Sequence, residues 1–314
     1  MTRRDVLRAG LAGTAASLAP LGCAPRPAPT PVDPGTDFVA ALLTDMHVDA
    51  NNDSAPGFAQ ALRKMMDRPQ QPEMLITGGD LAMDILATSE EEADAQYALF
   101  EDQLSAIDIP VHHTMGNHDM LGVFPDSGVD PADPKYGKQY FRDRFGNGST
   151  YQSFDWEGWH FVILDSLGIR DRAYIGHIDA EQLAWLDDDL AASGKPTVVT
   201  THVPLVSNYI EMQRGTEEGI PGGISVTNVH EVVPILEKHP VKLVLTGHLH
   251  INESFRYNGI EYATVGAVSG NWWKGARNGF EEGFALLEFR GQDVSWRYVD
   301  YGWEVEEETL TEAS

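Results

Sequence analysis

Residues 38–47 read FVAALLTDMH, an apolar run that changes at once to a polar tip. The run Phe38–Leu43 has the length and composition of a β-strand. Asp45 and His47 follow it, so a carboxylate and an imidazole stand where the chain leaves the strand. In open α/β sheets such strand ends deliver their side chains into a common crevice. The stretch therefore predicts a sheet with a functional site at its edge.

The same arrangement recurs four times along the chain. Each recurrence is a short strand-like run followed by a polar peptide, and these peptides are Gly79-Asp80, Gly116-Asn117-His118-Asp119, Thr201-His202-Val203-Pro204 and Gly247-His248-Leu249-His250. Any one of them alone would indicate a turn or a satisfied polar residue. Five in order favour a single site to which all of them contribute.

The side chains in these peptides favour a site for two metals. Carboxylates, imidazoles and one amide suit divalent Mn, Fe or Zn, and the lack of thiolates disfavours a closed structural zinc site. Asp80 lies in sequence between the amino-terminal and carboxy-terminal ligands, so it is the candidate to bridge both cations. We expect Gly78 and Gly79 to allow a tight turn. We expect Gly116 and Gly247 to leave room that a side chain would take from the metals.

The hydrophobic pattern between these peptides indicates the fold class. Early strands alternate with helices and antiparallel pairs dominate later, which favours a mixed α/β fold. We expect two mixed β-sheets packed face to face and flanked by helices, a four-layer αββα sandwich. The helices are predicted at Ala55–Asp67, Glu90–Ala106, Asp179–Ala192 (Asp179 near the cap) and Val229–Lys238, and the hairpins at 150–165, 254–264 and 284–299.

The chain has 314 residues and a formal net charge of −26. The length suits one large domain or two small ones. A surface this acidic repels nucleic-acid backbones, which argues against a nucleic-acid-binding protein. The single cysteine, Cys23, excludes an intrachain disulfide.

The amino-terminal residues indicate export. A basic start containing Arg3-Arg4 precedes an apolar stretch from Ala9 to Leu21, which is shorter than the roughly 20 residues of a membrane span. The arginine pair resembles a twin-arginine signal, and the residues ending at Cys23 resemble a lipoprotein box. We expect a periplasmic or lipid-anchored protein with a signal peptide at 1–23, a Pro-rich linker at 24–36 and a catalytic domain at 37–314. The alternatives are a cytosolic start with a chance arginine pair and a spare thiol at Cys23.

Together the five polar peptides resemble the calcineurin-like metallophosphoesterase superfamily. Its pattern is Asp-x-His, Gly-Asp, Gly-Asn-His-Asp/Glu, a separate His and Gly-His-x-His, and every element is present between Asp45 and His250. The resemblance implies the two-sheet fold and a pair of divalent metals. One metal would be held by Asp45, His47, Asp80 and His250, and the other by Asp80, Asn117, His202 and His248.

The resemblance also implies a mechanism, in-line attack on phosphorus by a hydroxide that bridges the metals. His118 would protonate or hydrogen-bond the leaving oxygen, with a structural histidine as the alternative. Asp119 would fix the local turn or orient neighbouring side chains, or it would be solvated. Some phosphatase branches carry Gly-Asp-x-x-Asp-Arg-Gly, but here the second carboxylate shifts to Asp84 and the arginine is missing. This departure disfavours a protein phosphatase.

The motifs resemble most the branch of cyclic-nucleotide and glycerophosphodiester phosphodiesterases. We expect a small phosphate ester as substrate, a diester in preference to a monoester. The alternatives are a phosphomonoesterase such as a nucleotidase and a non-catalytic binding protein, which is less favoured because no ligand is missing. Recognition is expected in the loops 126–140, 207–227 and 266–279.

The last of these loops contains the candidate substrate contacts. Asn271, Trp272 and Trp273 would form an aromatic wall beside the metals, with core packing as the alternative for the two tryptophans. Lys274 and Arg277 would hold a phosphate or only lighten an acidic surface. Elsewhere, His112 and His113 are neighbours on a strand, so at most one of them should face the crevice.

Overall fold

The computed structural model describes residues 36–215 and 219–305 of the chain. The predicted signal peptide at 1–23, the predicted lipid attachment site at Cys23 and the predicted linker at 24–36, apart from Thr36, lie outside these residues. No helix in the described ranges is long and apolar enough to cross a membrane.

Two mixed sheets form the centre of the fold, as predicted. The five-stranded sheet has the order β13 (Asp293–Asp300), β12 (Gly283–Arg290), β1 (Phe38–Leu43), β2 (Met74–Thr77) and β3 (Val111–His113). The six-stranded sheet has the order β10 (Glu253–Tyr257), β11 (Ile260–Thr264), β9 (Val241–Thr246), β8 (Thr197–Thr200), β5 (Trp159–Ile163) and β4 (Gln152–Trp156). Strands β1, β2 and β3 are parallel, and so are β5, β8, β9 and β11.

Strand β1 shows why the opening run of the sequence is apolar at every position. Phe38, Ala40 and Leu42 belong to the core between the two sheets. The alternate residues of β1 belong to the core between the five-stranded sheet and its helices. Successive side chains of a strand point to opposite faces, so a strand covered on both faces needs an unbroken apolar run.

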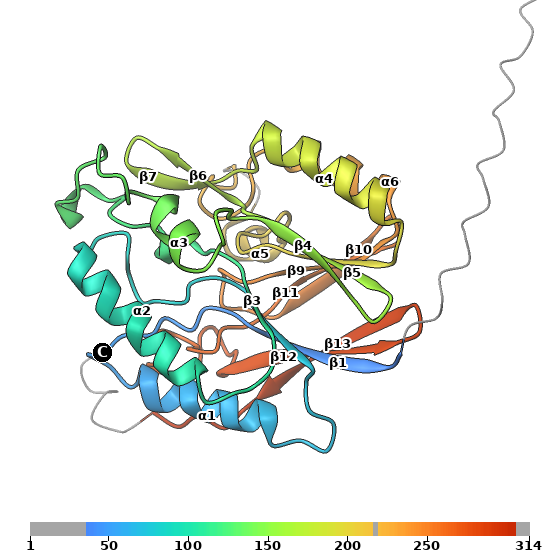
Figure 1. Cartoon of the computed structure of the whole chain (residues 1–314), viewed down its shortest axis with the longest axis horizontal. Coiled ribbons are helices and arrows are strands. Elements are labelled where there is room, and N and C mark those ends of the chain that lie inside the picture. Colours follow the sequence, from blue (N-terminus) through green and yellow to red (C-terminus); the bar gives the residue numbers. More distant parts are fainter. Residues whose placement is uncertain (1–35, 216–218, 306–314) are drawn as a thin grey trace, which may run out of the picture. The chain divides into compact units, whose positions relative to one another are not determined.

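Helices cover the outer faces of both sheets, which completes the predicted four-layer αββα arrangement (Figure 1). Helices α1 (Ser54–Met66) and α2 (Glu90–Leu104) pack together, as do α4 (Ala180–Ser193) and α6 (Val229–Lys238). The Asp179 side chain accepts a hydrogen bond from the Gln182 backbone N–H, so it caps α4 as predicted. The mixed α/β fold class is therefore confirmed.

Four elements lie where the sequence predicted neither a helix nor a strand. Helix α3 (Lys138–Arg144) begins within the loop expected at 126–140, and the short helix α5 (Tyr209–Arg214) lies in the loop expected at 207–227. Strands β6 (Leu167–Arg170) and β7 (Ala173–Gly176) form a separate two-stranded hairpin. In Figure 1 this hairpin extends beyond the large sheets, beside α3.

Candidate metal centre

All five polar peptides lie at one edge of the two sheets. The parallel strands β1, β2 and β3 end there, and Asp45, Asp80 and Asn117 follow them within a few residues. In the other sheet, β8 and β9 end at the same edge and lead to His202 and to the peptide 247–250. All the predicted metal ligands are buried except His248, which is partly buried. The structure thus brings all seven together.

Their side-chain atoms form two adjoining sets. His250 Nε2 lies 3.2 Å from Asp45 Oδ1 and 3.2 Å from His47 Nε2. The three side chains offer ligand atoms that lie within 4.8 Å of one another, and so do those of Asp80, His202 and His248. His47 links the two sets, because its Nε2 lies 3.6 Å from Asp80 Oδ2. Two adjoining sets of carboxylates and imidazoles suit divalent cations.

Asn117 joins the second set through its amide oxygen. Its Oδ1 lies 3.1 Å from His202 Nε2, and that nitrogen lies 3.2 Å from Asp80 Oδ2. His202 Nε2 therefore lies near both oxygen atoms. A carboxylate, an imidazole and an amide oxygen are the donor types that the sequence predicted for this set.

Each of the four candidate imidazoles has one nitrogen close to a backbone carbonyl. A carbonyl oxygen only accepts, so the facing nitrogen carries the proton and the other nitrogen is left as the donor toward a metal. This pairing fixes the tautomer and the direction of each ring. The pairs are His47 Nδ1 with Met83 O at 3.4 Å, His202 Nδ1 with Gly78 O at 2.8 Å, His248 Nε2 with Gly223 O at 2.7 Å, and His250 Nδ1 with Gly270 O.

The backbone is left-handed at five of the seven ligands. The φ values lie between 45° and 71°, a range that residues other than glycine avoid because Cβ crowds the backbone, and the residues are Asp45, His47, Asp80, His248 and His250. Such strain costs on the order of 1–3 kcal/mol per residue and collects at functional sites. The ligand loops are therefore shaped for side-chain placement at some expense of stability.

The glycines beside the ligands are needed for close packing. A Cβ on Gly116 would lie 2.1 Å from Asp80 Oδ1, and one on Gly247 would lie 2.5 Å from Asp45 Oδ2. Gly79 combines a φ of 97° with a Cβ position 2.5 Å from the His202 ring. The structure agrees with the prediction that a side chain at Gly116 or Gly247 would not fit. The side chain would clash first with the candidate ligands themselves, and not with the metals.

The electrostatics keep both aspartates ionised. Burial would raise the pKa of Asp80, but His202 and His118 outweigh burial and lower it well below the usual value. Burial would also raise the pKa of Asp45, and His250 outweighs it in the same way. Burial would lower the pKa of His202, yet the Asp80 carboxylate raises it to about 9. Without a metal the His202 imidazolium balances the Asp80 carboxylate, and a bound cation would replace the Nε2 proton in that role.

A family model described as calcineurin-like phosphoesterase matches residues 38–252, which span every candidate ligand. The chain belongs to this family. It is a hydrolytic, metal-dependent phosphoesterase, and its Asp and His cluster is compatible with a divalent metal site.

Relatives of this calcineurin-like phosphoesterase are known from sequence. A probable cyclic nucleotide phosphodiesterase of Synechococcus sp. is 26% identical over 220 residues, covering 67% of this chain and 72% of the relative. A second protein of that name, from Xenorhabdus bovienii, is 22% identical over 228 residues, covering 69% of this chain and 78% of the relative.

Solved structures support the fold of the phosphoesterase. A dimetal phosphatase from Danio rerio has a TM-score of 0.58 and 14% identity, with 84% of this chain and 99% of that chain covered. GAP50, the anchor in the inner membrane complex of Plasmodium, has a TM-score of 0.54 and 13% identity, with 86% of each chain covered. At these identities the likeness concerns the architecture alone.

His118 lies between the two sets of donors in this phosphoesterase. Its backbone N–H donates to Asp80 Oδ1 at 2.8 Å, and its ring meets the His47 ring edge-on at 4.8 Å. Its Nδ1 is buried without a hydrogen-bond partner among the described residues, and the nearest carboxylate oxygen is Asp84 Oδ1 at 3.8 Å. In the sequence the shifted position of Asp84 disfavoured a protein phosphatase, and the structure places this carboxylate next to the imidazole of His118.

Asp119 is fully buried and joins two ligand loops. Its carboxylate accepts hydrogen bonds from the backbone N–H groups of Leu81 and Gly116 and from the Tyr97 hydroxyl. Burial, and after it the charge of Asp80, raises the pKa of Asp119 to about 7. Of the predicted alternatives, the structure shows the orienting contacts and no solvated side chain.

The two neighbouring tryptophans have different surroundings. Trp273 is buried, and its indole N–H lies 3.1 Å from the carbonyl oxygens of both Met46 and His47. Trp272 is half-buried, and its ring lies 5.1 Å from the ring of His250. Core packing therefore describes Trp273, whereas Trp272 lies beside the candidate ligands. The Asn271 backbone N–H donates a hydrogen bond to the Gly275 carbonyl, and this bond closes the turn that contains both tryptophans.

Tyr174 is a neighbour of the centre that the sequence did not indicate. It lies on β7, and its ring meets the His248 ring edge-on at 6.1 Å. Burial, and then the charge of Asp80, raises the pKa of Tyr174 to about 12, so its hydroxyl stays protonated. No motif surrounds Tyr174 in the sequence, and its hairpin was not predicted.

Neither histidine of the pair on β3 belongs to the centre. The His112 ring stacks on Phe154 at 3.6 Å, and the His113 ring packs against Phe145 at 4.9 Å. The two rings thus point to opposite sides of the sheet, as the strand geometry predicts.

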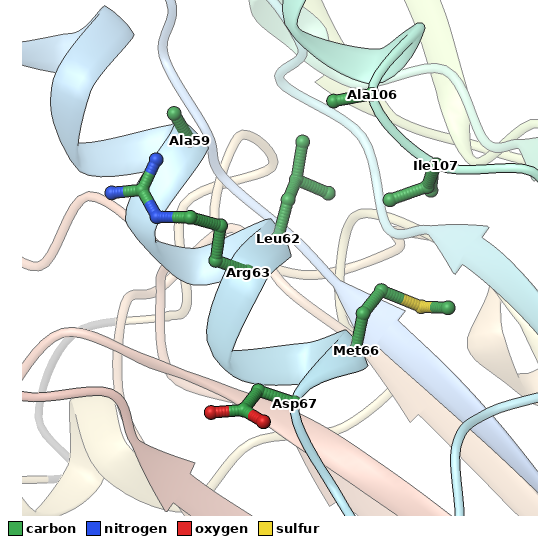
Figure 2. Close-up of a pocket in the computed structure, with 7 residues that line it drawn as sticks. All are labelled: Ala59, Leu62, Arg63, Met66, Asp67, Ala106 and Ile107. Carbon is green, nitrogen blue, oxygen red and sulfur yellow. The ribbon is translucent and has the colours of Figure 1, made fainter.

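A separate surface pocket of about 540 Å³ lies between α1 and the residues that follow α2. In Figure 2, Leu62 and Met66 of α1 extend toward Ala106 and Ile107, while Arg63 lies at the border. None of its lining residues is a candidate ligand. The pocket is mostly apolar, and the chemistry of the phosphoesterase lies elsewhere.

Proposed function

We propose that the chain is a dimetal phosphodiesterase. The observation that carries this proposal is the pair of adjoining donor sets that meet at Asp80. Asp45, His47, Asp80 and His250 would hold one cation, and Asp80, Asn117, His202 and His248 the other, with Mn, Fe and Zn as the candidate metals. When bound, two such cations ionise water at neutral pH and neutralise the charge that develops on the phosphate.

In this proposal His118 donates a proton to the oxygen of the leaving group. It lies between the donor sets, and its Nδ1 faces Asp84 at 3.8 Å. A carboxylate near that nitrogen would orient the ring and stabilise the imidazolium, whose Nε2–H would be the proton donor. Help from a general acid of this kind is worth about 10²–10⁴-fold in rate.

The preference for diesters is supported by the curated relatives. Three of them, from Synechococcus, Xenorhabdus and Rhodococcus, are named as probable cyclic nucleotide phosphodiesterases, at 22–26% identity. The half-buried Trp272 ring beside His250 adds an apolar surface for an organic group. We therefore propose small organic phosphodiesters as the substrates.

The test compares metal-loaded protein on bis-p-nitrophenyl phosphate and p-nitrophenyl phosphate. The diester is expected to give the larger kcat/KM. His118→Ala should lower kcat about 10²–10⁴-fold with its metal content unchanged, and Asp80→Asn should lose both metal and turnover. His230→Ala, an exposed histidine on α6, is the control and should keep full activity. Full activity in both site variants would refute these roles, and a larger kcat/KM on the monoester would make the protein a phosphomonoesterase.

We also propose that the protein is exported and held at a membrane through a lipid on Cys23. This rests on the amino-terminal sequence alone, because residues 1–35 lie outside the described part of the chain. Lipid labelling of Cys23→Ser against the wild type in an expressing bacterium tests it, and equal labelling of both would contradict it.

A further inference from the structure

The loop after the candidate ligands contains a tight turn encoded by Asn278-Gly279. Both residues have a positive φ, 52° and 85°, as a two-residue hairpin turn of the primed type requires. Arg277 and Phe280 on either side exchange two backbone hydrogen bonds of 2.9 Å. The Asn278 amide also donates to the Tyr209 hydroxyl of α5 at 2.6 Å. The turn therefore holds the backbone of Arg277 in one position.

The Arg277 guanidinium lies over the ring of Trp272, 4.4 Å from its centroid. The arginine is half-buried, and no carboxylate of the described residues forms an ion pair with it. Arg144 and Arg256, for comparison, each pair with a carboxylate at 2.9 Å or less. A half-buried guanidinium with only an aromatic platform keeps its donors available.

The platform places this guanidinium beside the metal centre. The Trp272 ring lies 5.1 Å from the His250 ring and 6.0 Å from the His47 ring. Trp272 and Trp273 both have left-handed backbones, with φ values of 50° and 67°, which bulky residues adopt only where the surroundings enforce it. Burial lowers the pKa of Arg277, and the charge of Asp45 acts in the opposite direction, so Arg277 lies within electrostatic reach of that ligand.

We propose that Arg277, seated on Trp272, binds a phosphoryl oxygen of the substrate. A planar guanidinium matches phosphate oxygens with paired donors, and a charge-assisted bond of this type is about twice as strong as a neutral one. The inference rests on the proposed phosphoesterase site and adds one substrate-binding residue to it. No carboxylate partner competes with the substrate for this guanidinium among the described residues.

The test uses the full, Mn-loaded protein and three variants. Arg277→Gln removes the charge, and Arg277→Lys keeps the charge but loses the planar fork. Lys242→Gln removes an exposed charge from β9, outside the site, and is the control. The measurements are KM and kcat on bis-p-nitrophenyl phosphate and the Kd of inorganic phosphate by calorimetry. Metal content and thermal midpoint of each variant show whether it is folded and loaded.

Arg277→Gln is expected to raise both KM and the phosphate Kd about tenfold, which corresponds to about 1.4 kcal/mol, with kcat changed less than about threefold. The KM and phosphate Kd of Arg277→Lys should lie between those of the wild type and Arg277→Gln, and Lys242→Gln should stay within about twofold of the wild type. Equal shifts in Arg277→Gln and Lys242→Gln would reduce the effect to net charge and overturn the proposal. Wild-type values in Arg277→Gln would do the same. The phosphate Kd does not depend on turnover, so an inactive wild type would count against the proposed function while this result still decides the role of Arg277.

Discussion

His113 is a histidine that the fold keeps neutral. Its ring is packed between Phe100 and Phe145, and its Nδ1 lies 3.1 Å from the Thr77 hydroxyl. Burial lowers the pKa of His113 to about 4, and the neighbouring His112 adds to this, while Glu101 opposes it. Between about pH 6.5, the ordinary histidine pKa, and about pH 4, His113 is therefore protonated in the unfolded chain and neutral in the folded chain.

His113 should consequently make stability fall on acidification. The folded pKa is the lower one, so its penalty is absent above about pH 6.5 and grows as the pH falls toward 4. Between pH 7.5 and 4 the wild type should lose about 3 kcal/mol more unfolding free energy than His113→Leu, which has no titrating group there. Urea unfolding at several pH values measures this. Parallel curves for the two proteins would show that His113 does not titrate in this way.

At the residue scale the sequence indicated the candidate metal ligands because motif and strand end coincide at each of them, and the structure brings these side chains together. The sequence could not show which of Trp272 and Trp273 is buried in the core and which lies beside the candidate ligands, because adjacent aromatic residues give the same compositional signal. Only the surroundings distinguish them, the backbone carbonyls for one ring and the His250 ring for the other. Tyr174 had no signal at all, because its contact with His248 depends on how a hairpin folds back.

Helix α1 packs against Trp273, a neighbour of the candidate metal centre, through one glycine. Gly57 is buried, and a Cβ there would lie 2.1 Å from the Trp273 ring. That indole donates to the carbonyl of His47, so movement of the ring is passed to a candidate ligand. The tight contact thus links packing under the helix to the shape of the site.

Gly57→Ala should therefore destabilise the protein. In an open helix the change would stabilise by about 0.5–1 kcal/mol, but overpacking against Trp273 should reverse the sign and cost about 1–3 kcal/mol. Metal affinity should fall as well. Ala59→Gly in the same helix is the control, since it reports helix propensity alone. Unfolding curves with metal titration measure both effects, and a more stable Gly57→Ala with normal metal affinity would contradict this account.

At the scale of elements, the large strands and helices agree with the sequence to within about two residues because their apolar periods are long. The β6–β7 hairpin was missed since its turn is Asp171-Arg172, both with positive φ, where Asn-Gly would have been recognised. The Arg172 guanidinium supports this region by donating to the carbonyls of Gly122 and Val129. These contacts compensate for the unfavourable positive φ values at the turn. They depend on residues distant in sequence, so a local pattern cannot predict them.

In the whole molecule the candidate ligands come from both sheets. Asp45, Asp80 and Asn117 follow strands of the five-stranded sheet, whereas His202 and His248 follow strands of the other. Bound cations would join the two sheets at this edge. A ligand that binds only the folded state stabilises it by mass action, by about 2.7 kcal/mol at a hundred times its Kd.

Metal removal should therefore lower the thermal midpoint. We expect a drop of roughly 5 °C or more when a chelator is added to metal-loaded protein. Asp80→Asn should show a much smaller difference with and without chelator, because Asp80 lies in the set with His202 and His248. Differential scanning calorimetry measures both. An unchanged midpoint for the wild type would mean that the cations do not link the sheets.

The left-handed ligand positions also bear on how this enzyme can be engineered. Glycine would relieve the backbone strain at Asp45, His47, Asp80, His248 or His250 and would remove the candidate metal-binding group at the same time. A library screened for heat resistance alone would therefore select glycine variants at these positions that are more stable but inactive. Screens of this enzyme need to measure turnover as well as stability.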